Sequence, residues 1–147
     1  MIVLLHECSP HMLAIEKASH VMPWTPATLC SCFQENYHVY GWYSENEPQQ
    51  LQGFYIAHQV GDEFTLMNIA VHPASQGQGI GRALMLHLIA LARRYQASIW
   101  LEVRVSNSSA QQLYASLQFT KVGQRPNYYP LDEGREDAIV MCRAADD

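Results

Sequence analysis

The stretch Val71–Leu84, VHPASQGQGIGRAL, carries glycines at three alternate positions, Gly77, Gly79 and Gly81, and runs directly into an apolar helical pattern. Glycine loses more backbone entropy on ordering than any other residue, so three of them are a costly way to begin a helix. The residues before the stretch read as a strand. Those after it keep helical spacing to about Tyr95, with apolar positions at Ile80, Leu84, Leu88 and Leu91. The stretch is therefore a junction between a strand and a helix.

The glycines at this junction indicate a loop that binds phosphate. A helix N-terminus presents unpaired N–H groups and a partial positive charge, and glycines allow a ligand to approach the backbone closely. Gly81 is followed by Arg82 and Ala83, which does not match a P-loop. The G-x-G-x-G spacing also differs from the dinucleotide fingerprint. We expect a pyrophosphate held by main-chain amides, with a turn that binds no ligand as the alternative.

The remaining pattern predicts a mixed sheet with helices on both faces, in a single domain spanning residues 1–147. Ser9-Pro10 and Thr25-Pro26 are each a capping residue followed by a first-turn proline, which favours two N-terminal helices. A short helix with cap residues is expected at 107–119. Strands are expected at 37–44, 51–60, 63–71, 98–105, 119–129 and 135–143. The expected order is α-α-β-β-β-α-β-α-β-β, an α/β fold.

Composition excludes several classes of protein. Hydrophobic residues make up 48% and charged residues 16%, which is a globular balance. The formal charge is −5 with nine Lys and Arg, so we expect no direct contact with nucleic acid. The apolar start is too short for a signal peptide and no run approaches a membrane span, so we expect a cytoplasmic protein without membrane association. The four cysteines form no C-x-x-C pair and the seven histidines lack metal-ligand spacing. We expect free thiols and no metal.

The segment Gln76–Gly81 fits the pattern Q/R-x-x-G-x-G/A and resembles the GNAT superfamily of acetyl-CoA-dependent N-acetyltransferases. The strand MNIAVHP before it and the segment NSSAQQLYASLQF after it stand where that superfamily has them. LEVRVSNSSAQQLYASLQF and RPNYYPLDEGREDAIVM are further similar to the bacterial RimI family, which acetylates the N-terminal alanine of a small-subunit ribosomal protein. Gly77 departs from many relatives, which carry a basic residue there.

The resemblance implies a mostly antiparallel, twisted central sheet, acetyl-CoA as co-substrate and a protein N-terminus as partner, with a basic ribosomal protein as the expected acceptor. It also assigns two catalytic residues. Glu102, from LEVR, matches the general base, and Tyr114, from LYASLQF, matches the proton donor. From the sequence alone, Glu102 could equally be a solvated strand residue or a partner of Arg104, and Tyr114 a packed core tyrosine.

The same resemblance implies two sets of binding residues. Main-chain groups of Ile69 and Val71 are expected to pair with the pantetheine arm. The full cofactor set is Asn68, Ile69, Ala70, Val71, Gln76, Gly77, Gln78, Gly79, Ile80, Gly81, Arg82, Asn107 and Tyr114. Asn107 also suits a plain helix N-cap and Arg82 an exposed helix charge. The peptide groove is expected to include Trp24, Tyr128 and Tyr129.

Amine chemistry favours an N-terminal acceptor without requiring one. An α-amine titrates near about 7.7–8.0 and a lysine amine near about 10.4, so only the α-amine is partly neutral at physiological pH. Three alternatives stay open. They are the same chemistry on a lysine, polyamine or small molecule, a non-catalytic acyl-CoA-binding module, and a subunit whose main role is protein contact. The oligomeric state is not predicted.

Overall fold

The computed structural model describes residues 1–146, and its elements follow the expected order with a short strand added at the N-terminus. The helices are α1 (Pro10–Ser19), α2 (Pro26–Cys30), α3 (Ile80–Arg94) and α4 (Ser108–Ser116). The strands are β1 (Ile2–Leu4), β2 (Tyr37–Tyr43), β3 (Leu51–Val60), β4 (Glu63–Val71), β5 (Ser98–Arg104), β6 (Thr120–Pro130) and β7 (Arg135–Arg143). Within this described part, no helix combines the length and the apolar character needed to cross a membrane.

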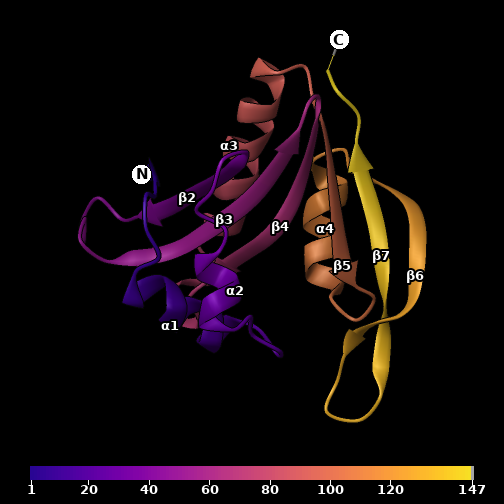
Figure 1. Cartoon of the computed structure of the whole chain (residues 1–147), viewed down its shortest axis with the longest axis horizontal. Coiled ribbons are helices and arrows are strands. Elements are labelled where there is room, and N and C mark those ends of the chain that lie inside the picture. The colour runs from indigo at the N-terminus through magenta and orange to yellow at the C-terminus, as the bar shows by residue number, and fades with distance from the viewer. Residues whose placement is uncertain (147) are drawn as a thin grey trace.

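The seven strands form one sheet in the order β1-β2-β3-β4-β5-β7-β6 (Figure 1). Every neighbouring pair is antiparallel except β4 and β5, which run parallel. Helices cover both faces, so the expected α/β fold with a mostly antiparallel mixed sheet is confirmed. The strand β1, which was not expected, pairs with β2 through Ile2, Val3 and Leu4.

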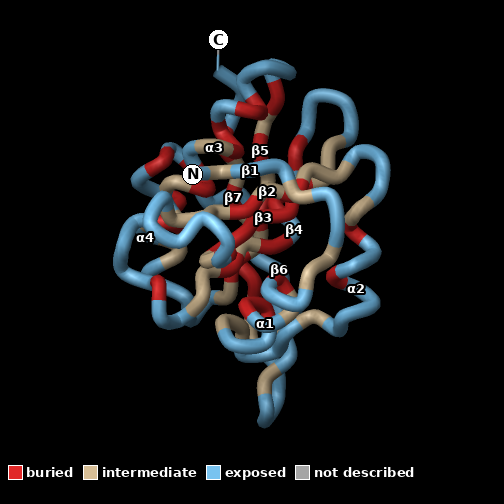
Figure 2. Tube along the Cα trace, turned by 90° about the vertical axis from the view of Figure 1, so that its left-hand side faces the viewer, coloured by how far each residue is buried: buried red, intermediate tan, exposed pale blue. Residues whose placement is uncertain are grey.

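Two apolar cores lie on opposite faces of this sheet, and β3 contributes to both. Successive side chains of a strand point to opposite faces. Tyr55 and Ala57 accordingly belong to the core beneath α3 and α4, while Phe54 and Ile56 belong to the core beneath α1 and α2. Buried positions gather around β3 in the middle of the molecule (Figure 2). The central strands therefore form a rigid base for the loops at their ends.

The parallel pair β4 and β5 separates soon after it begins. Its ladder joins Glu63–Thr65 to Ser98–Trp100 and goes no further. On the other side of β4, Ile56 faces Asn68 while Ala57 faces Leu66, so Met67 is an extra residue in a β-bulge. A bulge bends its strand and increases the local twist. From this point the two strands diverge in Figure 1, and their facing edges have no partner strand among the described residues.

Helix starts agree with the sequence, and one helix ends earlier than its apolar spacing indicates. Ser9 accepts a hydrogen bond from the Met12 amide at 3.2 Å, as expected of an N-cap. Helix α1 stops at Ser19, so Met22 lies beyond it although it continues the apolar spacing. Pro23 accounts for the exclusion of Met22 from the helix, because a residue that precedes proline is disfavoured in the helical conformation.

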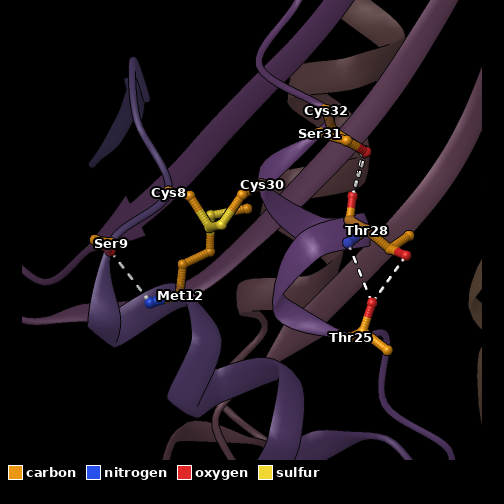
Figure 3. Close-up of a disulfide and its surroundings, with 8 residues drawn as sticks. All are labelled: Cys8, Ser9, Met12, Thr25, Thr28, Cys30, Ser31 and Cys32. Atoms are coloured by element: carbon orange, nitrogen blue, oxygen red, sulfur yellow. Dashed lines mark hydrogen bonds between the residues drawn. A yellow bond between two sulfur atoms is a disulfide. The ribbon is translucent and has the colours of Figure 1, made fainter.

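The expectation of free thiols is wrong for two of the four cysteines. Cys8 and Cys30 form a disulfide with a Cα–Cα distance of 5.1 Å (Figure 3), whereas Cys32 and Cys142 are free. The bond links the segment before α1 to the end of α2. Sequence spacing gave no sign of this pair, because the approach of the two cysteines depends on how α1 and α2 pack on the sheet.

Replacing Cys8 with serine should lower the free energy of unfolding by about 3 kcal/mol, because the bridge constrains a sizeable loop of the unfolded chain. The two cysteines are 22 residues apart in sequence. Urea unfolding without reductant measures the loss. In excess reductant, the wild-type protein should unfold at the same urea concentration as the Cys8→Ser variant. Cys142→Ser is the control. Equal midpoints for Cys8→Ser and the wild-type protein would show that the bond does not form.

Candidate active site

Two adjoining cavities lie where β4 and β5 separate. One has a volume of about 370 Å³ and is lined from α1, the α1–α2 connection, β4, β5, α4 and β6; we call it the cleft pocket. The other, of about 470 Å³, is lined by the glycine loop, the end of β4 and α4; we call it the loop pocket. His20, Ile69, Asn107 and Tyr114 line both. The two pockets therefore meet and can hold two reactants next to each other.

The loop pocket fits a phosphate group at the start of α3. Gly77 and Gly79 have φ of +78° and +80°, and nothing lies within 4 Å of a side-chain carbon built at either one. The backbone therefore requires glycine there and leaves open space above it. Gly79 is the N-cap of α3 and offers no side-chain cap, so the N–H groups of the first turn are available to a ligand.

The end of β4 forms a second wall of the loop pocket. Ile69, Ala70 and Val71 line it, along an edge that has no partner strand among the described residues. An unpaired strand edge can bind an extended ligand through its main-chain groups. The Gln76 side chain donates to the Val71 carbonyl at 3.1 Å, which ties the glycine loop back to the strand. Gln76 thus shapes this wall as well as lining the pocket.

Three residues of the expected cofactor set lie outside the loop pocket. Gln78 and Arg82 are not among the residues that line the loop pocket, and Arg82 donates to Ser116 Oγ on α4 at 3.1 Å. Asn68 lines the cleft pocket instead. Asn107 lines both pockets while its side chain caps α4 by accepting from the Ala110 amide at 3.1 Å. The remaining members of the set line the loop pocket.

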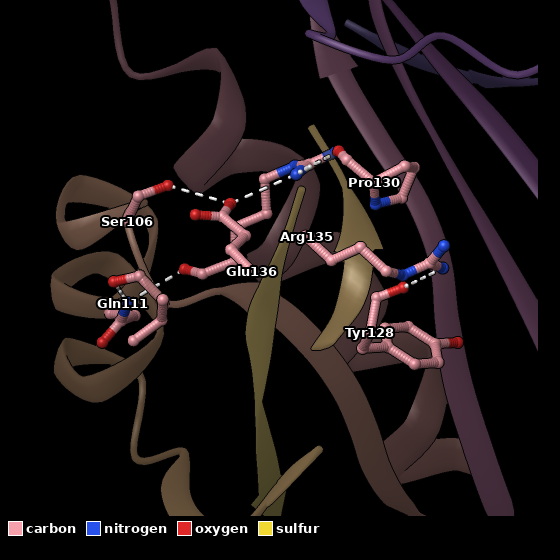
Figure 4. Close-up of polar contacts among 8 residues, drawn as sticks. Ser106, Gln111, Tyr128, Pro130, Arg135 and Glu136 are labelled. Atoms are coloured by element: carbon pink, nitrogen blue, oxygen red, sulfur yellow. Dashed lines mark hydrogen bonds and ion pairs between the residues drawn. The ribbon is translucent and has the colours of Figure 1, made fainter. Parts of the chain in front are cut away.

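Glu102 lies on β5 in the wall of the cleft pocket, with 24% of its side chain exposed. Its carboxylate pairs with the Arg125 guanidinium of β6, with Nε and Oε1 2.9 Å apart. The interpretation of Glu102 as a partner of Arg104 is wrong, because Arg104 pairs with Glu136 at 3.2 Å. Glu136 also accepts from Ser106 Oγ at 3.0 Å (Figure 4).

Tyr114 lies on α4 and lines both pockets. It is only 5% exposed and packs beside Phe119, so it is also a core residue. Among the described residues no buried side-chain nitrogen or oxygen lacks a partner, so the hydroxyl, which makes no hydrogen bond here, reaches open space. Burial, with a smaller effect of Tyr129, raises the pKa of Tyr114 to about 12. The phenol is protonated at neutral pH and can donate.

A bulge in β6 brings two tyrosines to the cleft. The register with β7 shifts between Arg125 and Tyr129, and Asn127 adopts a positive φ of 53°. Arg135 secures the bulge by donating to the Asn127 carbonyl at 2.9 Å. It also donates to the Tyr128 carbonyl at 3.2 Å (Figure 4).

The rings of these tyrosines lie under the guanidinium groups of Arg104 and Arg125. Tyr129 lines the cleft pocket with Arg104 over its ring at 4.6 Å, and Tyr128 lies beneath Arg125 at 5.4 Å. Burial and the Glu102 carboxylate raise the pKa of both hydroxyls, that of Tyr129 to about 12. Trp24 lines the same pocket. The three expected groove residues therefore gather around Glu102 and its pocket.

Three polar residues are among those of the cleft that sequence reasoning missed. Arg125 contacts Glu102, and Glu16 and His20 line the cleft pocket from α1 and its cap. A signal existed for Glu16, since it lies next to Ile15 on the buried side of α1, where a carboxylate is unusual. The sequence held no such signal for Arg125, because its partner Glu102 is distant in sequence.

Comparison with known proteins agrees with this geometry. The family model described as "Acetyltransferase (GNAT) family" matches residues 5–119. The [ribosomal protein bS18]-alanine N-acetyltransferase of Escherichia coli K12 is 45% identical over 134 residues, which cover 90% of this chain and 88% of the relative. The crystal structure of the Escherichia coli ribosomal-protein-S18-alanine N-acetyltransferase matches with a TM-score of 0.87 and 39% identity, over 97% of this chain and 92% of that one. A Bacillus subtilis acetyltransferase in complex with CoA matches with a TM-score of 0.79 over 97% of each chain, and at 17% identity it shows the fold alone.

Replacing Gly79 with alanine should weaken coenzyme A binding roughly tenfold, because the added side chain enters the space next to the first-turn amides and costs a charge-assisted hydrogen bond. Gly61 is a matched control, since it also has positive φ and open surroundings but lies in the β3–β4 turn. Both variants should lose about 1 kcal/mol of stability, the cost of a left-handed backbone for a side-chain-bearing residue. Isothermal titration with coenzyme A tests the difference, and equal affinity of the two variants would contradict the phosphate assignment.

Proposed function

The chain belongs to the GNAT family of acetyl-CoA-dependent N-acetyltransferases, and on this premise we propose that it acetylates the α-amine of the N-terminal alanine of ribosomal protein bS18. One observation carries the proposal. A partly exposed carboxylate, Glu102, and a buried, protonated phenol, Tyr114, line a cleft pocket that adjoins a phosphate-binding loop pocket. Transfer of an acetyl group to an amine needs these two groups, one to accept the amine proton and one to donate to the leaving thiolate.

The donor is held by the loop pocket. The backbone of Gly77, Gly79 and Gly81 at the start of α3 would hold the pyrophosphate, and the free edge of β4 at Ile69 and Val71 would pair with the pantetheine arm. Acetyl-CoA supplies an acetyl group already activated as a thioester. Asn107, at the cap of α4 where the two pockets meet, lies beside this path. The loop pocket thus orients the thioester toward the cleft.

The acceptor amine enters the cleft pocket, where Glu102 removes its proton directly or through a water molecule. The Arg125 ion pair demonstrates that a cationic N–H donor can approach the carboxylate to 2.9 Å. An incoming α-ammonium group would take the place of that guanidinium. Tyr114 then donates its hydroxyl proton to the departing thiolate. No covalent enzyme intermediate is needed, because the amine attacks the thioester directly.

The acceptor is a protein N-terminus rather than a nucleic acid or a lipid. The apolar wall of Val21, Met22 and Trp24 suits a small side chain next to the amine. The formal charge of −5 favours a basic protein and opposes contact with nucleic acid. In this proposal residues 1–147 act as one domain, in the cytoplasm, where ribosomal proteins are available.

Replacing Glu102 with glutamine should reduce kcat roughly 100-fold or more, because the amide cannot accept the amine proton. Coenzyme A affinity should stay at the wild-type value, since Glu102 lies outside the loop pocket. Thiol release from acetyl-CoA measures the first effect and isothermal titration the second. Glu133→Gln, an exposed carboxylate in the β6–β7 turn, is the control. Wild-type turnover by Glu102→Gln would remove Glu102 from the mechanism.

Replacing Tyr114 with phenylalanine removes the donor hydroxyl and keeps the packing beside Phe119, so kcat should fall roughly tenfold to 100-fold without loss of stability. The donor form exists below the phenol pKa and is lost above it. Because that pKa is raised to about 12, ionisation of Tyr114 should not lower the wild-type rate at neutral or moderately alkaline pH. A descending limb near pH 8 that disappears in Tyr114→Phe would contradict the raised pKa, whereas a wild-type kcat in Tyr114→Phe would contradict the donor role.

The acceptor is tested with two matched basic peptides. One has a free N-terminal alanine and blocked lysines, and the other has a blocked N-terminus and a free lysine. We expect turnover on the first alone. Turnover on the second alone would overturn the N-terminal assignment while keeping the acetyl transfer, and reaction of neither with coenzyme A still bound would favour a non-catalytic module.

A further inference from the structure

Glu16 is a buried carboxylate that the proposed reaction does not use. It lies in α1, lines the cleft pocket and is 2% exposed. Carboxylates are almost never fully buried unless their charge is paired or well hydrogen-bonded, because burial removes their hydration. Its surroundings therefore have to explain why it is there.

Both oxygens of Glu16 accept hydrogen bonds, and the donors come from two other parts of the chain. Oε1 accepts from Asn68 Nδ2 of β4 at 2.7 Å, and Oε2 accepts from the Trp24 amide at 2.8 Å. The His20 ring is the one basic group that the described chain places within 4.0 Å, at 3.4 Å from Oε1. The carboxylate thus connects α1, β4 and the connection between α1 and α2.

His20 completes this network, in which the direction of each hydrogen bond can be assigned. An ionised carboxylate only accepts hydrogen bonds, so the Asn68 amide nitrogen faces Glu16 and its oxygen faces His20. The His20 Nε2 to Asn68 Oδ1 distance is 2.9 Å, and Nε2 therefore carries a hydrogen. The side-chain orientations of Glu16, His20 and Asn68 depend on one another. A change at one of them disturbs the other two.

The connection at residues 21–24 depends on this network for its position. It contains no helix or strand, and Pro23 has no amide hydrogen. Within the part of the chain that the structure describes, its backbone makes one hydrogen bond, from the Trp24 amide to Glu16. Val21, Met22 and Trp24 nevertheless line the same pocket as Glu102 and Tyr114. The buried carboxylate therefore supplies the one backbone hydrogen bond of this apolar wall, next to the packing of Trp24 against the core.

We propose that Glu16 is a positioning residue that sets acceptor selectivity, by holding the wall of Val21, Met22 and Trp24 at the distance that admits a small first side chain. The inference rests on the function proposed above. A wall that is free to move would accept larger first residues and would hold a small one less tightly. The donor would be affected less than the acceptor, because Glu16 and the wall residues do not line the loop pocket and His20 is the one member of the network that does.

The test begins with Glu16→Gln. Glutamine offers one accepting oxygen where the carboxylate offers two. Either the Trp24 amide or the Asn68 amide then loses its partner, or Asn68 turns its amide over and His20 changes tautomer, so the network is disturbed in each case. We expect the acceptor KM to rise about tenfold with kcat nearly unchanged. The preference for an alanine-first over a leucine-first peptide should fall roughly tenfold, and the KM for acetyl-CoA should change less than the acceptor KM. Lys17→Gln, an exposed neighbour on the same helix, is the matched control.

The double variant Glu16→Gln/Asn68→Asp provides the rescue. The introduced glutamine can accept from the Trp24 amide and donate to the introduced aspartate, which also accepts from His20. Every hydrogen bond of the network is then kept, while the negative charge moves from position 16 to position 68. We expect the double variant to recover most of the acceptor KM and preference that Glu16→Gln loses, and to lie closer to the wild-type values than Asn68→Asp alone. The comparison with Asn68→Asp decides the matter even if Glu16→Gln alone fails to fold.

The outcomes separate this inference from the function on which it rests. No turnover of the alanine peptide by the wild-type enzyme overturns the proposed function and the inference with it. Wild-type turnover, together with a folded Glu16→Gln that matches Lys17→Gln in KM and preference, overturns the inference alone. A folded double variant that keeps the altered selectivity also overturns it, because restored hydrogen bonds would then have no effect on the wall.

Discussion

The site depends on one constraint, the short pairing of β4 with β5. The two strands share a parallel ladder of three residues each and then separate at the Met67 bulge. Parallel neighbours usually satisfy one another's backbone groups along their whole length. Here the separation leaves two facing edges without a partner strand among residues 1–146, inside a sheet whose other strands are well paired. The loop pocket and the cleft pocket both open from this separation.

The elements next to the separation use it in different ways. Helix α3 begins beside the end of β4 and brings uncapped amides to the loop pocket, while α4 projects Tyr114 between the two pockets. The cleft pocket also has charge on both sides. Glu102 pairs with Arg125 and Arg104 with Glu136, and the buried Glu16 is held by neutral donors and His20. Its carboxylates are thus oriented by different partners.

Features with a local cause could be predicted from the sequence. The strands at 51–60 and 63–71, the Ser9 and Asn107 caps and the glycine loop all follow from neighbouring residues. Features that depend on distant segments could not. The Cys8–Cys30 bond requires the packing of α1 against α2, and the choice of Arg125 by Glu102 requires the β6 bulge. The strand β1 has three residues, too few for a pattern of its own, and forms because β2 offers it an edge. The network of Glu16 joins α1 to β4 across 52 positions of sequence.

The two outer edges of the sheet have a consequence for how the protein associates. An exposed strand edge is a template for further strands and hence for aggregation, and proteins block it with short strands, prolines, charges and bulges. Here β1 has three residues, and β6 carries Pro126, Pro130, Lys121 and Arg125 and is broken by a bulge. Another chain therefore finds little to pair with at either rim. The free edge available to an extended molecule is the inner one, where β4 and β5 separate, so the sheet limits edge-to-edge pairing at its rims while leaving backbone groups open inside.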